Sequence, residues 1–159
     1  MKKIAFLTTI FTMPEEYLYD FFNSLEKQTY KYFDIIIVND GFNNLDIFIE
    51  KYKELNIFEL KGLDNIAKNR QIGINYCIDN NYDILIFGDS DDYFKENRIM
   101  ISLDKLEKYD IVVNDLTLFD KNGIIEKQYI SNRIENNTEI DFGFIKDKNI
   151  FGLSNTAIS

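Results

Sequence analysis

The stretch YDILIFGDSDD, residues 82–92, joins an apolar run to a glycine and a group of three carboxylates. The run ILIF is short and bounded by polar residues, which is typical of a strand covered on both faces of a parallel sheet. Asp89, Asp91 and Asp92 then follow within four residues. Because like charges repel, such a group is hard to keep ionised without a cationic partner. The stretch therefore predicts a central strand with a polar site at its end.

Apolar runs alternate with helical patterns along most of the chain, which predicts an α/β fold with a mainly parallel sheet flanked by helices. Asp64 is the expected N-cap of one helix. The pattern weakens after Lys121, and the closing FGLSNTAIS (151–159) is either a binding loop or a frayed end. The expected strands are residues 3–10, 34–40, 57–60 and 110–119, while residues 82–92 hold a strand with its exit loop and residues 121–130 offer one more strand after a turn. The expected helices start near Pro14 and cover residues 45–55, 64–80 and 95–109.

The composition limits the kinds of protein that this chain can be. A length of 159 residues suggests that residues 1–159 form a single domain. A net charge of -9 argues against nucleic acid as a partner. The chain has one cysteine and no histidine, which excludes an internal disulfide, a Ser-His-Asp triad and a His-ligated zinc site. Any metal site would use oxygen ligands, which favour Mg²⁺, Mn²⁺ or Ca²⁺.

The expected location follows from the same features. No apolar run is long enough to cross a bilayer, so no transmembrane segment is expected. Because a single cysteine gives no sign of an oxidising compartment, we expect a cytoplasmic protein, and a peripheral position at the inner face of the membrane stays open.

Polar residues follow three of the predicted strands. In open parallel sheets, ligands bind beyond the carboxyl ends of the strands. Thr8 and Thr9 end the first strand and Asp40 ends the second, while residues 89–92 follow the fourth. Three separated segments are therefore expected to bring polar groups to one edge of the sheet, which is the main argument for a site.

These signals also have ordinary structural explanations. One aspartate in GDSDD would serve as a helix cap, and Asp40-Gly41 is a common turn pair. Three carboxylates exceed what capping requires, however, and a divalent cation would relieve their repulsion. Lys68 and Arg70 lie on a predicted helix, where they form either an exposed charged face or a binding site for a diphosphate.

The order of these segments resembles the family 2 glycosyltransferases, which have the GT-A fold. The resemblance lies in LTTIF, SLEKQTY, VNDGF, NRQIGI and FGDSDD, and FGLSNTAIS is similar to a later family loop with a glycine and small polar residues. It covers nearly the whole chain and implies a Rossmann-like GT-A domain with a DXD motif. The implied activity is metal-dependent, inverting transfer of a sugar from a nucleotide-sugar donor, often UDP-linked. Mn²⁺ or Mg²⁺ would be the cofactor. The acceptor would be a glycan or a lipid-linked molecule, and the enzyme would act in polysaccharide biosynthesis.

The resemblance also implies roles for individual residues. Thr8 and Thr9 would line the pocket for the base, and Asp40 would bond to the base. Arg70 would lie near the ribose or the diphosphate.

Residues 89–92 would form the other side of the donor site. Asp89 and Ser90 would contact the nucleotide-sugar, and Asp91 would ligate the metal that bridges the two phosphates. Asp92 would support the metal site or face the acceptor.

The chain departs from the family pattern in several places. In the first motif, Thr8 and Ile10 stand where the family has proline and tyrosine. In the second motif, Asn39 and Phe42 replace the family Asp and Ser, and in the third Gln71 replaces an Asn. In the family, the catalytic base and much of the acceptor site lie beyond the position of Ser159. Asp141 is an acid available within this chain. We therefore expect a donor half, which is a complete short protein, a truncated transferase or a degenerate one.

Three other classes of protein compete with this interpretation. The absence of a base region favours a domain that binds a nucleotide or nucleotide-sugar without transfer. A nucleotidyltransferase uses similar acids, but it prefers a glycine-rich loop after the first strand, and LTTIFTMPEE has no glycine. A phosphoacceptor receiver domain needs acids after that strand, where this chain has threonines.

Overall fold

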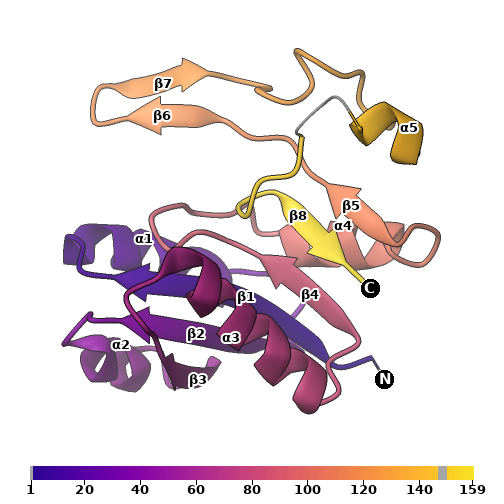
Figure 1. Ribbon diagram of the computed structural model, residues 1–159. Helices are drawn as coiled ribbons and strands as arrows, with labels where there is room; N and C mark the ends of the chain where they lie inside the picture. The colour runs from indigo at the N-terminus through magenta and orange to yellow at the C-terminus, as the bar shows by residue number, and fades with distance from the viewer. Residues whose placement is uncertain (1, 147–149) are drawn as a thin grey trace.

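The computed structural model describes residues 2–146 and 150–159. Its centre is a six-stranded sheet in the order β3-β2-β1-β4-β8-β5, and a separate hairpin pairs β6 with β7 (Figure 1). The elements are β1 (Ile4–Phe11), α1 (Glu15–Glu26), β2 (Asp34–Asp40), α2 (Leu45–Lys51), β3 (Asn56–Lys61), α3 (Ile66–Asp79), β4 (Ile84–Phe87), α4 (Arg98–Lys105), β5 (Ile111–Val113), β6 (Leu118–Asp120), β7 (Gly123–Glu126), α5 (Phe142–Ile145) and β8 (Thr156–Ile158).

The sheet is mainly parallel, as the alternating pattern predicted. β1 pairs in parallel with β2 and β4, and β2 pairs in parallel with β3. β8 runs antiparallel to both of its neighbours, β4 and β5. The carboxyl ends of β1, β2 and β4 therefore lie at one edge of the sheet, where a ligand site is expected.

Both faces of the sheet are covered, which explains why its strands are continuous apolar runs. On one face, α1, α2 and α4 pack on Phe6, Ile35 and Ile37 in the larger of two apolar clusters. On the other face, α3 places the buried Cys77 against Leu7 and neighbouring apolar side chains. α3 crosses in front of the strands in Figure 1. The expectation that Cys77 is a buried small hydrophobe is confirmed.

One buried glutamine fixes where α4 begins. The Gln28 side chain donates from Nε2 to the carbonyl of Lys95 at 2.8 Å and accepts from the backbone N–H of Ile99 at 3.1 Å. The carbonyl of Glu96 accepts from the backbone of Thr29 at 2.7 Å. These bonds hold residues 95–97 as a strap that ends in a turn, in which Arg98 N–H donates to the Lys95 carbonyl at 3.0 Å. The helix therefore starts three residues later than predicted.

The predicted cap of α3 is wrong by one residue. Asp64 has a φ of 43°, and its N–H donates to the Asp40 carboxylate at 2.8 Å. Asn65 has the extended backbone that an N-cap needs, and its side chain accepts from Lys68 N–H. Asp64 thus belongs to the loop that joins β3 to α3.

The region after α4 differs most from the prediction. The single strand expected at residues 110–119 is two short strands, because Asp115 turns the chain by accepting from the N–H groups of Leu116 and Ile130. The strand expected at residues 121–130 is the shorter β7. The closing segment is not a frayed end, since β8 lies between two other strands of the sheet.

Candidate functional site

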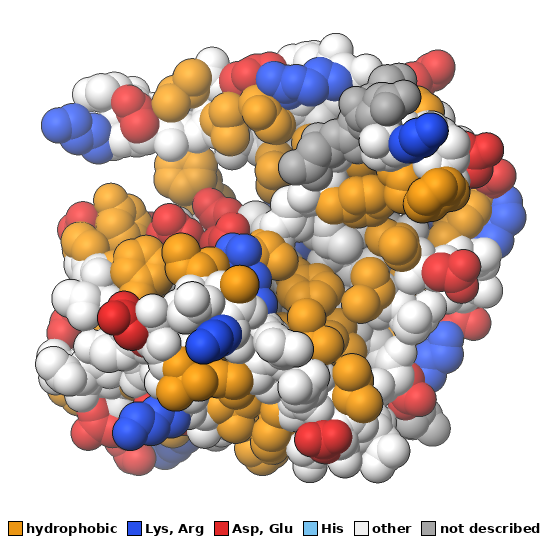
Figure 2. Space-filling model, viewed as in Figure 1, with side chains coloured by type: hydrophobic (Ala, Val, Ile, Leu, Met, Phe, Trp, Pro, Cys, Tyr) orange, Lys and Arg blue, Asp and Glu red, His pale blue; other side chains and the backbone are white. Residues whose placement is uncertain are grey.

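The carboxyl edge of the sheet brings together the segments predicted from the sequence. The register of β1 and β2 places Phe11 beside Asp40. The Ser90 hydroxyl donates to the Thr9 carbonyl at 2.9 Å, which fastens the loop after β4 to β1. A further segment, the turn before β8, joins them through Ser154. Figure 2 shows a hollow between the β6–β7 hairpin and the body of the molecule, with acidic and basic side chains together on its lower wall.

Gly88 allows the chain to leave β4 and enter the site. A Cβ at this position would lie 2.4 Å from the Phe6 ring and 2.7 Å from the Phe94 ring. Both rings belong to the buried core, so neither can move aside at low cost. The glycine is therefore required by close packing directly before the acid group, by which we mean Asp89, Asp91 and Asp92.

Ser154 connects two members of the acid group. Its hydroxyl accepts from the backbone N–H of Asp89 at 3.0 Å and lies within hydrogen-bonding distance of the carboxylates of both Asp89 and Asp92. The side chain is buried, so these bonds form largely out of water. Of the two alternatives for the C-terminal segment, a binding loop or a frayed end, the contacts of Ser154 with the acid group favour the binding loop.

Two carboxylates of the acid group are held where ionisation is unfavourable. Burial raises the pKa of Asp89, as do the charges of Asp92 and Asp91, while Ser154 and Arg70 oppose the rise. Burial likewise raises the pKa of Asp92, against the effects of Ser154 and Arg98. A cation bound here would favour the ionised forms of both groups. The electrostatics of this loop thus suit a positively charged ligand.

The structure places Arg70 and Lys68 in different settings. Arg70 on α3 is half-buried, lies close enough to Asp89 to lower its pKa, and has a buried Nε that no residue of the described chain satisfies. Lys68 is exposed in the first turn of the same helix. Arg70 is thus the better placed of the two to meet an anion beside the acid group.

Asp40 is tied into the loop that follows β3. One carboxylate oxygen accepts from Asp64 N–H at 2.8 Å, and the other accepts from the Asn69 amide at 2.7 Å. Asn69 is buried and in turn accepts from Leu63 N–H. Each carboxylate oxygen has a second lone pair, so Asp40 retains capacity to accept from a ligand.

The residues predicted beside Asp40 differ in accessibility. Thr9 is half-buried on the face of β1 that carries Leu7. Thr8 is buried on the opposite face, and Ser90 is buried with its hydroxyl committed to the Thr9 carbonyl. Of these three residues, Thr9 is the one with exposed surface that a base could contact.

Asp91 is the exposed member of the acid group. Within residues 2–146 and 150–159, no three His, Cys, Asp or Glu side chains are gathered so as to hold an ion among themselves. Mg²⁺ is usually held by one or two carboxylates together with the oxygens of substrate phosphates. An exposed carboxylate on a loop that disfavours negative charge fits that mode of binding.

Two acids in the second part of the chain are held by backbone groups. Asp115 accepts from the N–H groups of Leu116, Ile130 and Ser131 and from the Ser131 hydroxyl, and its pKa is lowered by these bonds although burial opposes them. Asp141 caps α5 by accepting from Phe144 N–H at 2.9 Å. Asp115 is therefore not free to act as a general base, and Asp141 has a local structural role.

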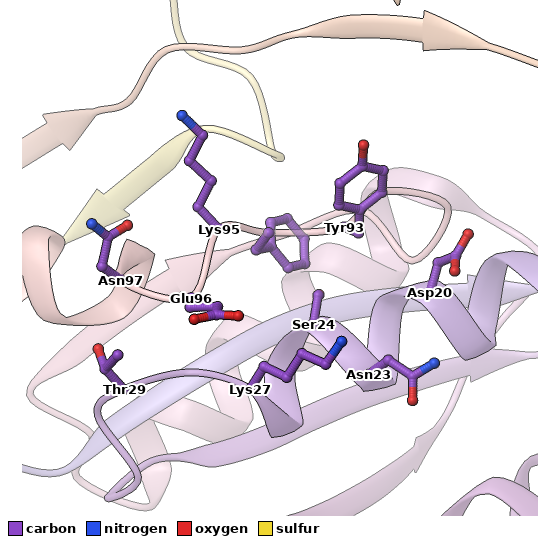
Figure 3. Close-up of a pocket in the computed structure, with 10 residues that line it drawn as sticks. Asp20, Asn23, Ser24, Lys27, Thr29, Tyr93, Lys95, Glu96 and Asn97 are labelled. Atoms are coloured by element: carbon purple, nitrogen blue, oxygen red, sulfur yellow. The ribbon is translucent and has the colours of Figure 1, made fainter. Parts of the chain in front are cut away.

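The structure also contains a polar groove away from the acid group (Figure 3). It has a volume of about 640 Å³ and lies between α1 and the strap that precedes α4. Tyr93, next to Asp92 in the chain, forms part of its wall, but none of the predicted site residues lines it. The groove is lined by Asp20, Asn23, Ser24, Lys27, Thr29, Tyr93, Phe94, Lys95, Glu96 and Asn97.

Sequence reasoning missed two buried polar residues near the acid group, Arg98 and Ser154. Arg98 lies in KENRIMI, where a basic residue at a helix start has the appearance of an exposed one, yet it is buried. Ser154 lies in FGLSNTAIS, which the sequence offers as a binding loop, but nothing in the sequence links it to Asp89 and Asp92. No local signal distinguishes either residue, because Ser154 meets carboxylates 62 and 65 residues away and the burial of Arg98 depends on the packing of Phe6 and Phe94.

Comparisons with known proteins agree with this geometry. The model of the family described as "Glycosyl transferase family 2" matches residues 7–157. A search of curated proteins finds no match. Among the helices of the described part of the chain, none has the length and apolar character needed to cross a membrane.

Several solved structures share the fold. S. aureus TarS superposes with a TM-score of 0.61 at 22% identity, over 79% of this chain and 23% of TarS. TarS 1-349 in complex with UDP-GlcNAc gives 0.64 at 20% identity, over 78% of this chain and 37% of that one. The 4-diphosphocytidyl-2C-methyl-D-erythritolsynthase from Anaerococcus prevotii DSM 20548 gives 0.56 at 15% identity, over 99% of this chain and 71% of that one.

The chain spans well under half the length of the TarS chains that it matches. At these identities the likeness to solved structures concerns the fold, whereas the family match extends from β1 to β8. The sheet, its helices and the polar edge are those that the quoted motifs led us to expect. The chain therefore belongs to glycosyl transferase family 2 and has the GT-A fold.

Proposed function

We propose that this protein is a metal-dependent, inverting glycosyltransferase that takes a sugar from a nucleotide-sugar donor, preferably UDP-linked. The observation that carries the proposal is the joining of Asp89 and Asp92 by Ser154 at the carboxyl edge, with Arg70 near Asp89. The family match and the UDP-GlcNAc complex of TarS support the choice of donor.

Different side chains of the site bind different parts of the donor. Thr9 contacts the base. Asp40 accepts a hydrogen bond from a ring N–H of the base, because its bonds to Asn69 and Asp64 do not occupy all of its lone pairs. Arg70 donates to the ribose or the diphosphate from the α3 side. The buried Thr8 and Ser90 shape the loop beneath the ligand.

The acid group holds the diphosphate end of the donor. Asp91 would hold Mn²⁺ or Mg²⁺ together with phosphate oxygens, and Asp89 contacts the nucleoside. When bound, the ion would supply neutralisation of the charge on the departing nucleoside diphosphate. Asp92, fixed by Ser154, keeps the loop in shape or faces the acceptor.

In the transfer itself, an acceptor hydroxyl attacks the anomeric carbon from the side opposite the diphosphate. The new bond joins the acceptor oxygen to that carbon, and the bond from the carbon to the phosphate oxygen breaks. A carboxylate base takes the hydroxyl proton, and the nucleoside diphosphate leaves. The acceptor is a glycan or lipid-linked hydroxyl, and we propose a cytoplasmic protein that meets it at the inner face of the membrane.

A second candidate function is nucleotide-sugar binding without transfer. Two acids that could have served as a general base favour it. The Asp115 carboxylate accepts hydrogen bonds from backbone groups, and Asp141 caps α5. Neither acid is placed as a base for an acceptor, whereas the positions of Asp40, Arg70 and the acid group support binding of a donor.

Calorimetric titration tests both functions. UDP, GDP and CDP are titrated with and without Mn²⁺ into the wild type and into Asp91→Ala, with Asp104→Ala, an exposed acid on α4, as the matched control. We expect Mn²⁺-dependent UDP binding that Asp91→Ala weakens by at least about tenfold and the control leaves unchanged. Absence of metal-dependent nucleotide binding would overturn the donor site. Binding of UDP-sugars without release of UDP in the presence of acceptor glycans would favour the binding domain.

A further inference from the structure

The polar groove of Figure 3 begins one residue after the acid group. Residues 93–97 all line it, and Tyr93 directly follows Asp92 in the chain. The opposite wall is formed by α1 and the residues that follow it, as far as Thr29. Its volume of about 640 Å³ is that of a site for a small ligand. The groove is therefore a candidate binding site that leads away from the acid group.

The two walls of the groove are fastened to each other at one end. The buried Gln28 side chain, which follows α1, donates to the Lys95 carbonyl at 2.8 Å and accepts from Ile99 N–H at 3.1 Å. Thr29 N–H donates to the Glu96 carbonyl at 2.7 Å. Because these bonds hold the strap against the end of the helix, a ligand can bind between the walls without first ordering them.

The groove carries charges of both signs that do not pair. Asp20 and Lys27 line it from the helix wall, and Lys95 and Glu96 line it from the strap (Figure 3). All four side chains are exposed, and none of the ion pairs found within the described residues includes any of them. An ionic ligand of either sign would meet a like charge here. An uncharged ligand with many hydroxyl groups would find both carboxylate acceptors and ammonium donors.

Two further side chains of the groove suit a sugar. The Tyr93 ring is 56% exposed, although its centroid lies 5.0 Å from that of Phe119. An exposed aromatic ring offers an apolar face and a polar hydroxyl to a ligand. Asn23 is half-buried, and its Oδ1 accepts from the Tyr52 hydroxyl at 2.8 Å. This bond fixes the amide and leaves its two N–H donors to other partners.

We propose that this groove is a saccharide-binding site that holds an uncharged acceptor glycan, with the reacting sugar at the Tyr93 end, next to Asp92. The saccharide site stands on the groove alone, whereas its use by an acceptor rests on the proposed function. The proposal narrows the acceptor from any hydroxyl compound to a glycan chain that lies along residues 93–97.

NMR titration of the isotope-labelled protein in EDTA tests the saccharide site. The probes are uncharged tetrasaccharides of glucose, mannose, galactose and N-acetylglucosamine, together with charged tetramers of galacturonate and of glucosamine. We expect an uncharged probe to shift the amide signals of residues 20–29 and 93–97, and to bind at least about fivefold more tightly than the charged ones. Shifts confined to other parts of the chain, or no binding by any uncharged probe, would overturn the proposal. Tighter binding of a charged tetramer would refute the uncharged ligand.

Two pairs of variants locate the contacts. Tyr93→Ala should weaken binding of the best probe by at least about fivefold, because the aromatic surface is lost. Its control is Tyr32→Ala, since Tyr32 is also an exposed member of an aromatic pair but does not line the groove. Lys27→Ala should weaken binding by about threefold through a lost hydrogen bond, and the exposed Lys53, outside the groove, is its control as Lys53→Ala. Equal effects within either pair would count against the site.

A second titration, with UDP and Mn²⁺ present, tests the acceptor role. Mn²⁺ is paramagnetic, so an ion held at the acid group should broaden the saccharide signals most strongly at the end nearest Tyr93. The same mixture with diamagnetic Mg²⁺ is the control. If Mn²⁺ broadens the amide signals of residues 89–92 but no saccharide signal, the groove does not hold the acceptor. If those amide signals are not broadened either, the proposed donor site fails, and the titration in EDTA still decides whether the groove binds a saccharide.

Discussion

Residues 4–106 and residues 107–159 are held together in different ways. The first region contains nearly all of the buried apolar side chains, and in the described part of the second region Ala157 is the one that is buried to the same degree. The second region is joined by polar contacts instead, centred on Asp115 and Ser154. The apolar core therefore determines the fold, whereas a few hydrogen bonds complete the candidate site.

The largest effect should come from the core of the first region. Phe22 is fully buried and stacks on Phe48 and Tyr52, at centroid distances of 5.7 and 5.2 Å. We expect Phe22→Ala to lower the free energy of unfolding by about 3–5 kcal/mol in urea denaturation. Phe119→Ala removes a 41%-exposed ring of the second region and should cost less than about 1 kcal/mol. Equal losses would show that the hairpin is as much part of the core as α1.

A smaller effect should come from Asp115, and it should depend on pH. The pKa of this carboxyl is lowered in the folded state, so its stabilising effect is present above the ordinary value of 3.8 and is lost as the pH falls through the lowered value. At neutral pH we expect Asp115→Ala to lower local stability by about 2 kcal/mol, read as faster amide exchange at Ile130 and Ser131.

The acid range provides the control for that experiment. Because protonated Asp115 accepts weakly, wild type and variant should converge in stability below the lowered pKa. A difference that stays constant from neutral to acidic pH would mean that the side chain acts through packing and not through its charge.

The smallest effect on stability, but one with consequences for ligand binding, is expected for Ser154. Removal of its hydroxyl in Ser154→Ala should lower the free energy of unfolding by about 1–2 kcal/mol. UDP binding with Mn²⁺ should weaken as well, because Asp89 and Asp92 lose their common partner.

Ser24→Ala is the matched control, since Ser24 and Ser154 are both 8% exposed and Ser24 donates to the Phe21 carbonyl within α1. It should lower stability to a similar extent and leave UDP binding unchanged. If both variants lose UDP binding alike, the second region has no special part in the site.

The difference between the apolar first region and the polar second region also explains how much of the structure the sequence could predict. The strand at residues 34–40 was predicted to the residue, because a run of β-branched side chains between polar ends is a strong local signal. The convergence of Thr9, Asp40 and the acid group followed from the parallel order of the strands. Where signals are local and apolar, prediction succeeded.

The sequence-based predictions failed where the structure depends on contacts between residues that are distant in the sequence. β8 has three residues, too few for a periodic pattern, and its place depends on pairing with β4 and β5. The burial of Arg98 results from the packing of Phe6 and Phe94, which no helical pattern around residue 98 reveals. The roles of the individual donor-site residues stay predictions until ligand binding is measured.

The position of β8 has a consequence for the order in which the chain assembles. β4 and β5 precede it in the chain, but each is paired on one side with residues 156–158. During synthesis, β4 and β5 therefore cannot be joined until those residues leave the ribosome, and until then both present unpaired backbone groups. The step that closes this gap also brings Ser154 to Asp89 and Asp92. The acid group thus gains its Ser154 contacts only when β8 enters the sheet.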